Sequence, residues 1–230
     1  MRTLSIIIPA LNEADRIGGA LAALAPLRAG GVEVVVVDGG SSDATVQIAQ
    51  PSADRIITAA RGRARQMNAG AAVARGDVLL FLHADSTLPP DADRLVLDAL
   101  AGSNRVWGRF DVAIDGPASL GVVAMMMNIR SRLTGIATGD QAMFVNRAAF
   151  AAAGGVPEIE LMEDIALSRR LKTFGPPLCL QQRVVTSGRR WQQRGILRTI
   201  LLMWRLRLAY FFGAQPAALA RQYGYVPREH

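Results

Sequence analysis

The chain has 230 residues, of which 50% are hydrophobic and 20% are charged, with a formal net charge of +7 and one cysteine. This composition excludes a disordered chain, a collagen and a small disulfide-stapled protein, and the length is enough for one globular domain with its own core. The charge is uneven, because residues 165–230 carry 12 basic side chains and only one acidic one, Glu229. We therefore expect an anionic partner.

The first half of the chain alternates apolar runs with helical patterns. Continuous apolar runs predict strands buried on both faces over residues 5–9, 34–38 and 77–83, and a shorter run predicts a strand over 55–58. Helices are expected between them over 11–26, started by Asn12 and ended by Pro26, and over 43–49 and 62–74. Strands joined by helical crossovers predict an α/β fold with a doubly wound, mainly parallel sheet and helices on both faces.

The second half is less regular and ends in an arginine-rich helix. Helices are expected over 91–100, 120–133, 147–153 and 163–174, with strands over 106–114 and 142–145. The last predicted helix, 196–212, is strongly apolar, and Arg194, Arg198 and Arg205 lie close together on its helical wheel. Arg207 lies opposite them, which favours a core-packing helix over one lying on a membrane, although peripheral membrane contact stays open. The chain shows no targeting signal and no run long enough to span a bilayer, so we expect a cytoplasmic protein.

Polar residues follow three of the predicted strands. Ligands of doubly wound sheets bind beyond the carboxyl ends of the strands, so these residues are the first candidates for a site. Asp38 ends a run of four valines and must be paired or bind a ligand, although residues 39–43 equally fit a plain turn. His83 and Asp85 are two residues apart and face the same way, so they could meet a divalent cation or a diphosphate. A G-x-G-x-x-G loop is missing, which argues against NAD or FAD.

The runs S-I-I-I-P-A-L-N-E, V-V-V-D-G-G-S-S-D and L-H-A-D resemble the successive signatures of family 2 glycosyltransferases of the GT-A fold. The resemblance implies a GT-A domain over residues 1–190, a helical extension over 191–230 packed on it, a UDP-sugar donor and a divalent metal, Mg²⁺ or Mn²⁺. It assigns nucleotide-sugar binding to Pro9, Ala10, Asn12, Glu13, Asp38, Gly40, Arg61, Arg65, Gln66, Asn68, His83 and Ala84.

The same resemblance assigns the metal and the chemistry. The D-x-D element of the family reads His83-Ala84-Asp85 here, so Asp85 inherits the metal role, and His83 contacts either the metal or a phosphate. Inverting transfer needs a carboxylate that accepts a proton from the acceptor, and Asp164 is the first candidate and Glu163 the second. Both could instead sit at the positive end of a helix dipole. The related G-D-Q run adds Asp140 to the catalytic set, and acceptor or phosphate contacts are assigned to Gln141, Arg189, Arg190 and Trp191.

Four further runs narrow the resemblance to one branch of the family. L-H-A-D-S, T-G-D-Q, L-M-E-D-I-A-L-S-R-R-L and S-G-R-R-W resemble the radical-SAM/selenodomain-associated transferases, which include the selenosugar synthases of selenoneine biosynthesis. Membership implies transfer of a sugar from UDP-N-acetylglucosamine or UDP-glucose to selenophosphate, giving a 1-seleno sugar. The alternative is another acceptor, such as a polyprenyl phosphate at a membrane surface. A homodimer stays open, and no nucleic acid is expected, because no recognised binding module accompanies the basic charge.

Overall fold

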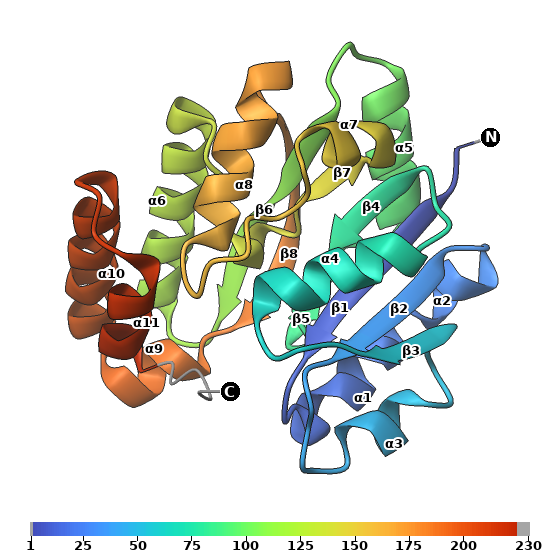
Figure 1. The fold of residues 1–230 in the computed structure, drawn as a ribbon, viewed down its shortest axis with the longest axis horizontal. Helices are drawn as coiled ribbons and strands as arrows, with labels where there is room; N and C mark the ends of the chain where they lie inside the picture. The colour runs from blue at the N-terminus through green and yellow to red at the C-terminus, as the bar shows by residue number, and fades with distance from the viewer. Residues whose placement is uncertain (1, 225–230) are drawn as a thin grey trace.

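A computed structural model describes residues 2–224 and shows one eight-stranded sheet in the order β3-β2-β1-β4-β7-β6-β8-β5 (Figure 1). The strands are β1 Leu4–Ala10, β2 Glu33–Asp38, β3 Arg55–Thr58, β4 Val78–Phe81, β5 Ser86–Thr87, β6 Trp107–Asp115, β7 Phe144–Asn146 and β8 Leu178–Ser187. The first four run parallel to one another, β7 is antiparallel to β4 and β6, and β8 is parallel to β6. The mainly parallel sheet predicted from the sequence is confirmed.

Helices cover both faces of the sheet because its central strands are apolar on both sides. In β1, Ile6 and Ile8 face one core and Ile7 faces the other, and all three are fully buried. The first core is covered by α1 Ala14–Ala23, α2 Ala25–Ala29, α5 Ala92–Ala101 and α6 Ala118–Thr134, with α3 Thr45–Ala49 packed on α1. The second is covered by α4 Arg63–Val73, α7 Arg147–Ala152 and α8 Glu163–Leu171, and Figure 1 shows α4 lying across β1 and β2.

Three helices end the described part of the chain: α9 Arg189–Arg194, α10 Ile196–Phe211 and α11 Pro216–Tyr223. Leu206 of α10 and Leu219 of α11 form a small third core with Met162 and Ile165, which lie at the start of α8. The C-terminal helices therefore pack against the segment that carries the predicted catalytic acids. The other face of α10 is exposed, so the expectation of a core helix is wrong for half of its surface. In the described residues, no helix is both long enough and apolar enough to cross a bilayer.

Several elements differ from the sequence predictions. The single helix expected over 11–26 is two helices broken at Leu24, and Pro26 lies in the first turn of α2, where a missing N–H costs nothing. Asn12 does not cap α1, because its φ is 54° and its side chain accepts a hydrogen bond from Ser42 N instead. Strands β5 and β8 were not expected. The residues of β8 do not alternate regularly between buried and exposed, so they lack the sequence pattern of a strand. The strand is defined mainly by its long pairing with β6.

Candidate active site

Asp38 lies at the carboxyl end of β2 and is only 5% exposed. Its carboxylate accepts hydrogen bonds from Gly40 N at 3.0 Å and from Ser41 N at 3.1 Å. Gly40 has φ 87°, a conformation that side chains with a Cβ disfavour, so this tight turn depends on glycine. The acid at the end of the valine strand is therefore stabilised by its own turn, and nucleotide binding by Asp38 and Gly40 stays a prediction.

The loops after β1 and β2 are fastened to each other. Asn12 N donates to Ser41 Oγ at 2.9 Å, and Glu13 N donates to Thr45 Oγ1 at 2.8 Å. The carboxylate of Glu13 pairs with Arg16 at 2.9 Å. These contacts fix the loops at the carboxyl ends of β1 and β2, where the family resemblance places the nucleotide.

Two side-chain amides that were predicted to bind the nucleotide-sugar, those of Gln66 and Asn68, make hydrogen bonds within the protein. Gln66 is buried, and its Nε2 donates to Ala10 O and to Val37 O, both at 2.8 Å, so it ties α4 to β1 and β2. Asn68 Nδ2 donates to Val156 O at 2.9 Å, and its Oδ1 accepts from Val156 N at 2.8 Å. Both side chains therefore help to hold the walls of the site, and their predicted contacts with the nucleotide-sugar stay predictions.

A short 3₁₀ helix, η1 Gly139–Gln141, meets the end of β4. His83 Nδ1 lies 3.4 Å from Asp140 Oδ1, and the other side of the imidazole lies directly against Gly139, leaving no room for a Cβ there. Gln141 is fully buried and forms a capping box with Thr138, which holds this turn. Its predicted contact with the acceptor stays a prediction. The turn thus holds the Asp140 carboxylate beside the His83 imidazole.

Asp164 and Glu163 begin α8 and line one pocket. Asp164 Oδ2 accepts from Gly139 N at 3.1 Å and its Oδ1 accepts from Ile165 N at 2.7 Å. Glu163 is 7% exposed, and its carboxylate lies 3.8 Å from the Arg63 guanidinium. The residues that line the pocket come from five segments: Pro9, Arg63, Met67, Phe81, Leu82, His83, Gly139, Met143, Glu163 and Asp164.

Burial controls the charge of these acids. It raises the pKa of Glu163, and the neighbouring Asp164 charge raises it further, against the opposing effect of Arg63. Burial also raises the pKa of Asp164, although its two backbone hydrogen bonds partly offset this. Burial acts in the same direction on Asp140, but the hydrogen bond with His83 and the charges of His83, Arg63 and Arg190 outweigh it and lower its pKa. The site therefore combines two acids of raised pKa with one that is firmly ionised.

Arginines surround these acids. Partial desolvation lowers the pKa of Arg190, although the residue is exposed, and the charges of Asp140 and Asp85 act against this shift. Its guanidinium stacks over the Tyr223 ring at 4.6 Å. Sequence reasoning missed Arg130 of α6, whose buried Nε and Nη2 atoms have no hydrogen-bond partner in the structure and whose charge acts on Asp164 and Asp140. No local motif marks Arg130, because only the packing of α6 beside α8 brings it near the acids.

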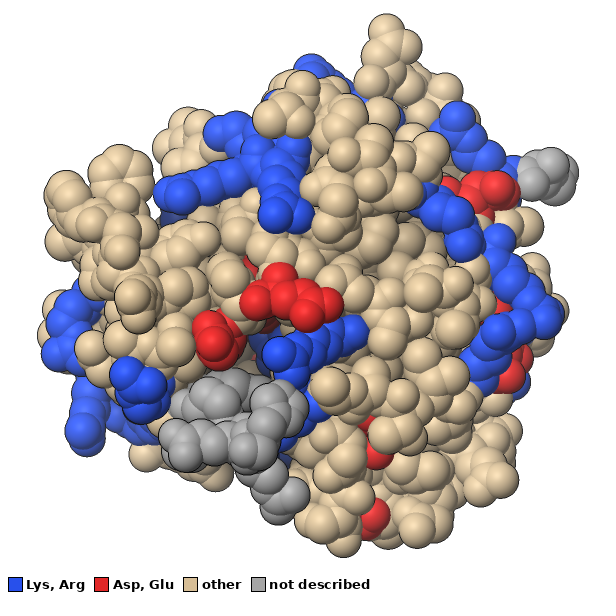
Figure 2. Space-filling view, in the orientation of Figure 1, with Lys and Arg blue, Asp and Glu red and all other residues tan. Residues whose placement is uncertain are grey.

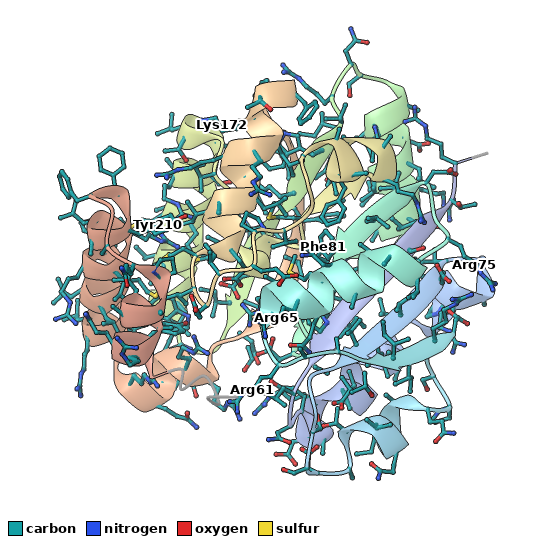
Figure 3. The ribbon with its side chains drawn as sticks, in the orientation of Figure 1. Arg61, Arg65, Arg75, Phe81, Lys172 and Tyr210 are labelled. Carbon is teal, nitrogen blue, oxygen red and sulfur yellow. The ribbon has the colours of Figure 1, made fainter. Side chains whose placement is uncertain are left out.

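The remaining predicted residues lie around this centre. Arg65 pairs with Glu158 at 3.5 Å, and Figure 3 shows Arg61 and Arg65 near the start of α4. Figure 2 shows acidic side chains in the middle of this face beside arginines. Pro9 lines the pocket, Ala84 is buried, and Arg189 is exposed. Trp191 packs against the first core, which leaves its predicted acceptor contact without support.

Asp85 is half-buried beside the charge of Arg190. Among residues 2–224, no group of three or more histidines, cysteines or acids lies close enough to hold a metal ion unaided. A metal held by one or two of these side chains would need further ligands from a substrate.

A mainly parallel α/β sheet with carboxylates and arginines gathered beyond its strand ends is the architecture of a nucleotide-sugar transferase of the GT-A type. Residues 5–151 match the glycosyl transferase family 2, and the chain belongs to that family. The chain is 32% identical over 98 residues to the glucosyl-3-phosphoglycerate synthase of Mycolicibacterium paratuberculosis. That match covers 38% of this chain and 30% of the relative, so the chain spans about a third of the length of that protein.

Solved structures share the fold over most of the chain. Staphylococcus aureus TarS, residues 1–349, in complex with UDP-GlcNAc, superimposes with a TM-score of 0.65 at 18% identity, over 80% of this chain and 58% of TarS. The glucosyl-3-phosphoglycerate synthase of Mycobacterium tuberculosis, in complex with Mn²⁺, UDP and glucosyl-3-phosphoglycerate, superimposes with a TM-score of 0.59 at 22% identity. That match covers 80% of this chain and 71% of the synthase. These likenesses confirm the GT-A fold predicted from the sequence.

Proposed function

We propose that the protein transfers a sugar from a UDP-sugar to an anionic acceptor with inversion at the anomeric carbon. The observation that carries the proposal is the joint position of Asp140, Glu163 and Asp164 with Arg63 and His83 beyond the ends of β1 and β4. Family membership supports the donor class, and the related structures hold UDP-GlcNAc in one case and UDP with Mn²⁺ in another.

The donor diphosphate would lie near Asp85, Arg190 and His83. A divalent metal fits this position, because Mg²⁺ and Mn²⁺ are commonly bound by one or two protein groups together with substrate phosphates. Asp85 is the residue that would hold it, and His83, whose Nδ1 lies beside Asp140, would contact either the metal or a phosphate. When bound, the metal would neutralise charge on the departing diphosphate. Arg190 supplies a further positive charge at the same place.

Asp164 is the carboxylate that we assign as base, with Glu163 second. Its two backbone hydrogen bonds fix its position, and its raised pKa brings its proton affinity closer to that of a useful base. The acceptor attacks the anomeric carbon on the face opposite the diphosphate, the bond between that carbon and the UDP oxygen breaks, and its electron pair leaves with UDP.

Selenophosphate is the acceptor that we favour. The resemblance of four sequence runs to the selenosugar synthase branch supports it, and so do the positive charges of Arg63, Arg130 and Arg190 around the acids. Its selenium is already a strong nucleophile, so the site mainly has to hold an anion in place, which arginines do well. Attack through selenium followed by hydrolysis of the selenium–phosphorus bond gives the 1-seleno sugar and phosphate.

The test is incubation of the purified protein with selenophosphate, Mg²⁺ and either UDP-N-acetylglucosamine or UDP-glucose, followed by mass spectrometry. A selenium isotope pattern on the sugar, with one UDP released per product, is the expected result. Release of UDP in the presence of a different acceptor, without any seleno-product from either donor, would refute the selenophosphate assignment while keeping the transferase activity. No UDP release under any of these conditions would refute the transferase proposal itself.

A further inference from the structure

Helix α10 carries an apolar stripe that nothing in the described residues covers. Leu197, Leu201, Trp204, Leu208 and Phe211 are between 60% and 76% exposed. Their spacing of four, three, four and three residues places all five on one side of the helix. The opposite side is anchored, because Leu206 is fully buried in the third core with α8 and α11. The helix is thus held in the fold by one face and presents large apolar side chains on the other.

Basic residues border this stripe on both sides. At 100° per residue, Arg198 and Arg205 lie about 90° from the centre of the stripe on one side, and Arg207 lies about 80° away on the other. Arg207, whose position on sequence alone argued against a membrane-facing helix, is half-buried with its Nε inside the protein, and it places one basic residue on the second side. No aspartate or glutamate occurs between residues 165 and 228. Within residues 2–224, no salt bridge includes a basic residue after position 164.

A second apolar stripe lies on α6, which Figure 1 shows at the same end of the molecule as α10. Its members are Val122, Met125, Met126, Ile129 and Leu133, each between 49% and 82% exposed. Soluble monomers rarely leave so much contiguous apolar surface on regular helices unless another surface covers it.

We propose that α10 lies flat on an anionic phospholipid surface, with its apolar stripe in the boundary between headgroups and acyl chains and with Arg198, Arg205 and Arg207 at the lipid phosphates. A stripe of leucines with one tryptophan and one phenylalanine, bordered by cations, is the composition that such in-plane helices use. The helix is 16 residues long and lies on the membrane without crossing it.

Charge distinguishes this partner from a second copy of the chain. A two-fold contact places the same surface against itself, so the basic borders of two α10 helices would face each other without a carboxylate to pair them. An anionic lipid surface supplies the missing negative charge and attracts each arginine near it. A lipid surface would therefore cover the apolar stripe and also pair the arginines beside it, whereas a dimer would cover the stripe but leave the arginines unpaired.

The test is flotation of the full-length protein with vesicles of phosphatidylcholine alone and of phosphatidylcholine with phosphatidylglycerol. We expect flotation with the anionic vesicles, weakened by salt, and a blue shift of tryptophan fluorescence that is missing in Trp204→Phe. The double variant Leu201→Ser with Trp204→Ser should lose most of the bound fraction, and Arg198→Gln with Arg205→Gln should lose the salt-dependent part. Phe174→Ser, at an exposed residue outside both stripes, is the matched control and should float like the wild type.

Three results would overturn the proposal. The first is no flotation with either vesicle, and the second is equal flotation with both. The third is a wild-type dimer, measured by light scattering, that becomes a monomer in the double variant Leu201→Ser with Trp204→Ser. Because these side chains are exposed, the variants should keep the wild-type melting temperature, so a lost signal reports the surface and not the fold. Flotation does not depend on catalysis, so its failure would leave the proposed sugar transfer untouched.

Discussion

Asp164 shows how burial and hydrogen bonding act together on one side chain. Burial raises the pKa of its carboxyl, while hydrogen bonds from Gly139 N and Ile165 N keep both oxygens in place. A base needs this combination of fixed position and raised proton affinity. The Glu163 carboxylate has a backbone hydrogen bond from its own residue and lies 3.8 Å from the Arg63 guanidinium.

Replacing Asp164 with asparagine tests the assignment of the base. General base catalysis contributes about 10²–10⁴-fold, and a selenium nucleophile needs the least help, so we expect kcat to fall about 100-fold. The KM for the UDP-sugar should change little, because Asp164 is assigned to the acceptor side. Asp98→Asn, an exposed change on α5, is the control for removal of one carboxylate. Wild-type turnover in Asp164→Asn would show that Asp164 is not the base.

Glu163 should make stability depend on pH. Its pKa is raised in the folded state, so the folded protein binds more protons than the unfolded one between the ordinary and the raised value. Stability of the wild type therefore falls as pH rises through that window. Glu163→Gln removes this cost and should melt at a higher temperature than the wild type at pH 8, with the difference vanishing near pH about 4. A lower melting temperature at pH 8 would show that the pairing with Arg63 outweighs the burial.

At the scale of elements, close packing of α4 on the sheet positions the residues that face the pocket. A Cβ at Gly70 would lie 2.5 Å from Ile7 Cγ2 and 2.9 Å from Val37 Cγ2, so only glycine lets the helix approach β1 and β2 this closely. The same helix carries Arg63 and Met67 into the pocket and Gln66 to the strand ends. Helix position and site geometry are thus coupled.

A pair of glycine variants tests this packing. Gly70→Ala overpacks the contact with the sheet and should destabilise the fold by about 1–3 kcal/mol. Gly121→Ala is the matched control, because Gly121 lies on the exposed side of α6 with nothing within 4 Å of its Cβ position. It should stabilise the helix by about 0.5–1 kcal/mol. Urea unfolding midpoints measure both, and equal effects of the two changes would contradict the close approach.

At the scale of the whole molecule, the two ends of the chain contribute opposite charges to one site. The acids Asp38, Asp85 and Asp140 precede residue 165, and the strongly basic remainder contributes Arg190. The other C-terminal arginines border the exposed face of α10. Under the two proposals, the basic part of the chain therefore contributes to two surfaces: the side of the site proposed to hold the diphosphate, and the proposed lipid surface.

Binding of UDP and Mn²⁺ should stabilise the whole fold. At a ligand concentration about 100 times Kd the gain is about 2.7 kcal/mol. For a chain of this size that corresponds to a rise in Tm of about 5–10 °C. Asp85→Asn should keep the shift caused by UDP alone and lose the increment from Mn²⁺, with Asp98→Asn as the control. An unchanged Mn²⁺ increment in Asp85→Asn would remove Asp85 from the metal site.

The amino-acid sequence by itself determined the first four strands, the presence of helices between them, though not their exact bounds, and the acids at the strand ends. Continuous apolar runs and helical spacing are local patterns, and polar residues that follow such runs are visible without a fold. This is why Asp38, His83 and Asp85 were found from the sequence as residues at strand ends, and why the family signatures could be recognised.

Only the tertiary structure decided which side chains are free to act. Gln66, Asn68 and Gln141 belong to motifs, and the structure adds that their amides also make hydrogen bonds with distant backbone or within a buried turn. Arg130 and the pairing of β8 with β6 depend on elements that are far apart in the chain. The exposed face of α10 was equally hidden, because an apolar stripe looks the same in sequence whether it packs on a core or faces outward. Burial is a property of the assembled fold, and that is the physical reason why local patterns locate a site but do not assign its contacts.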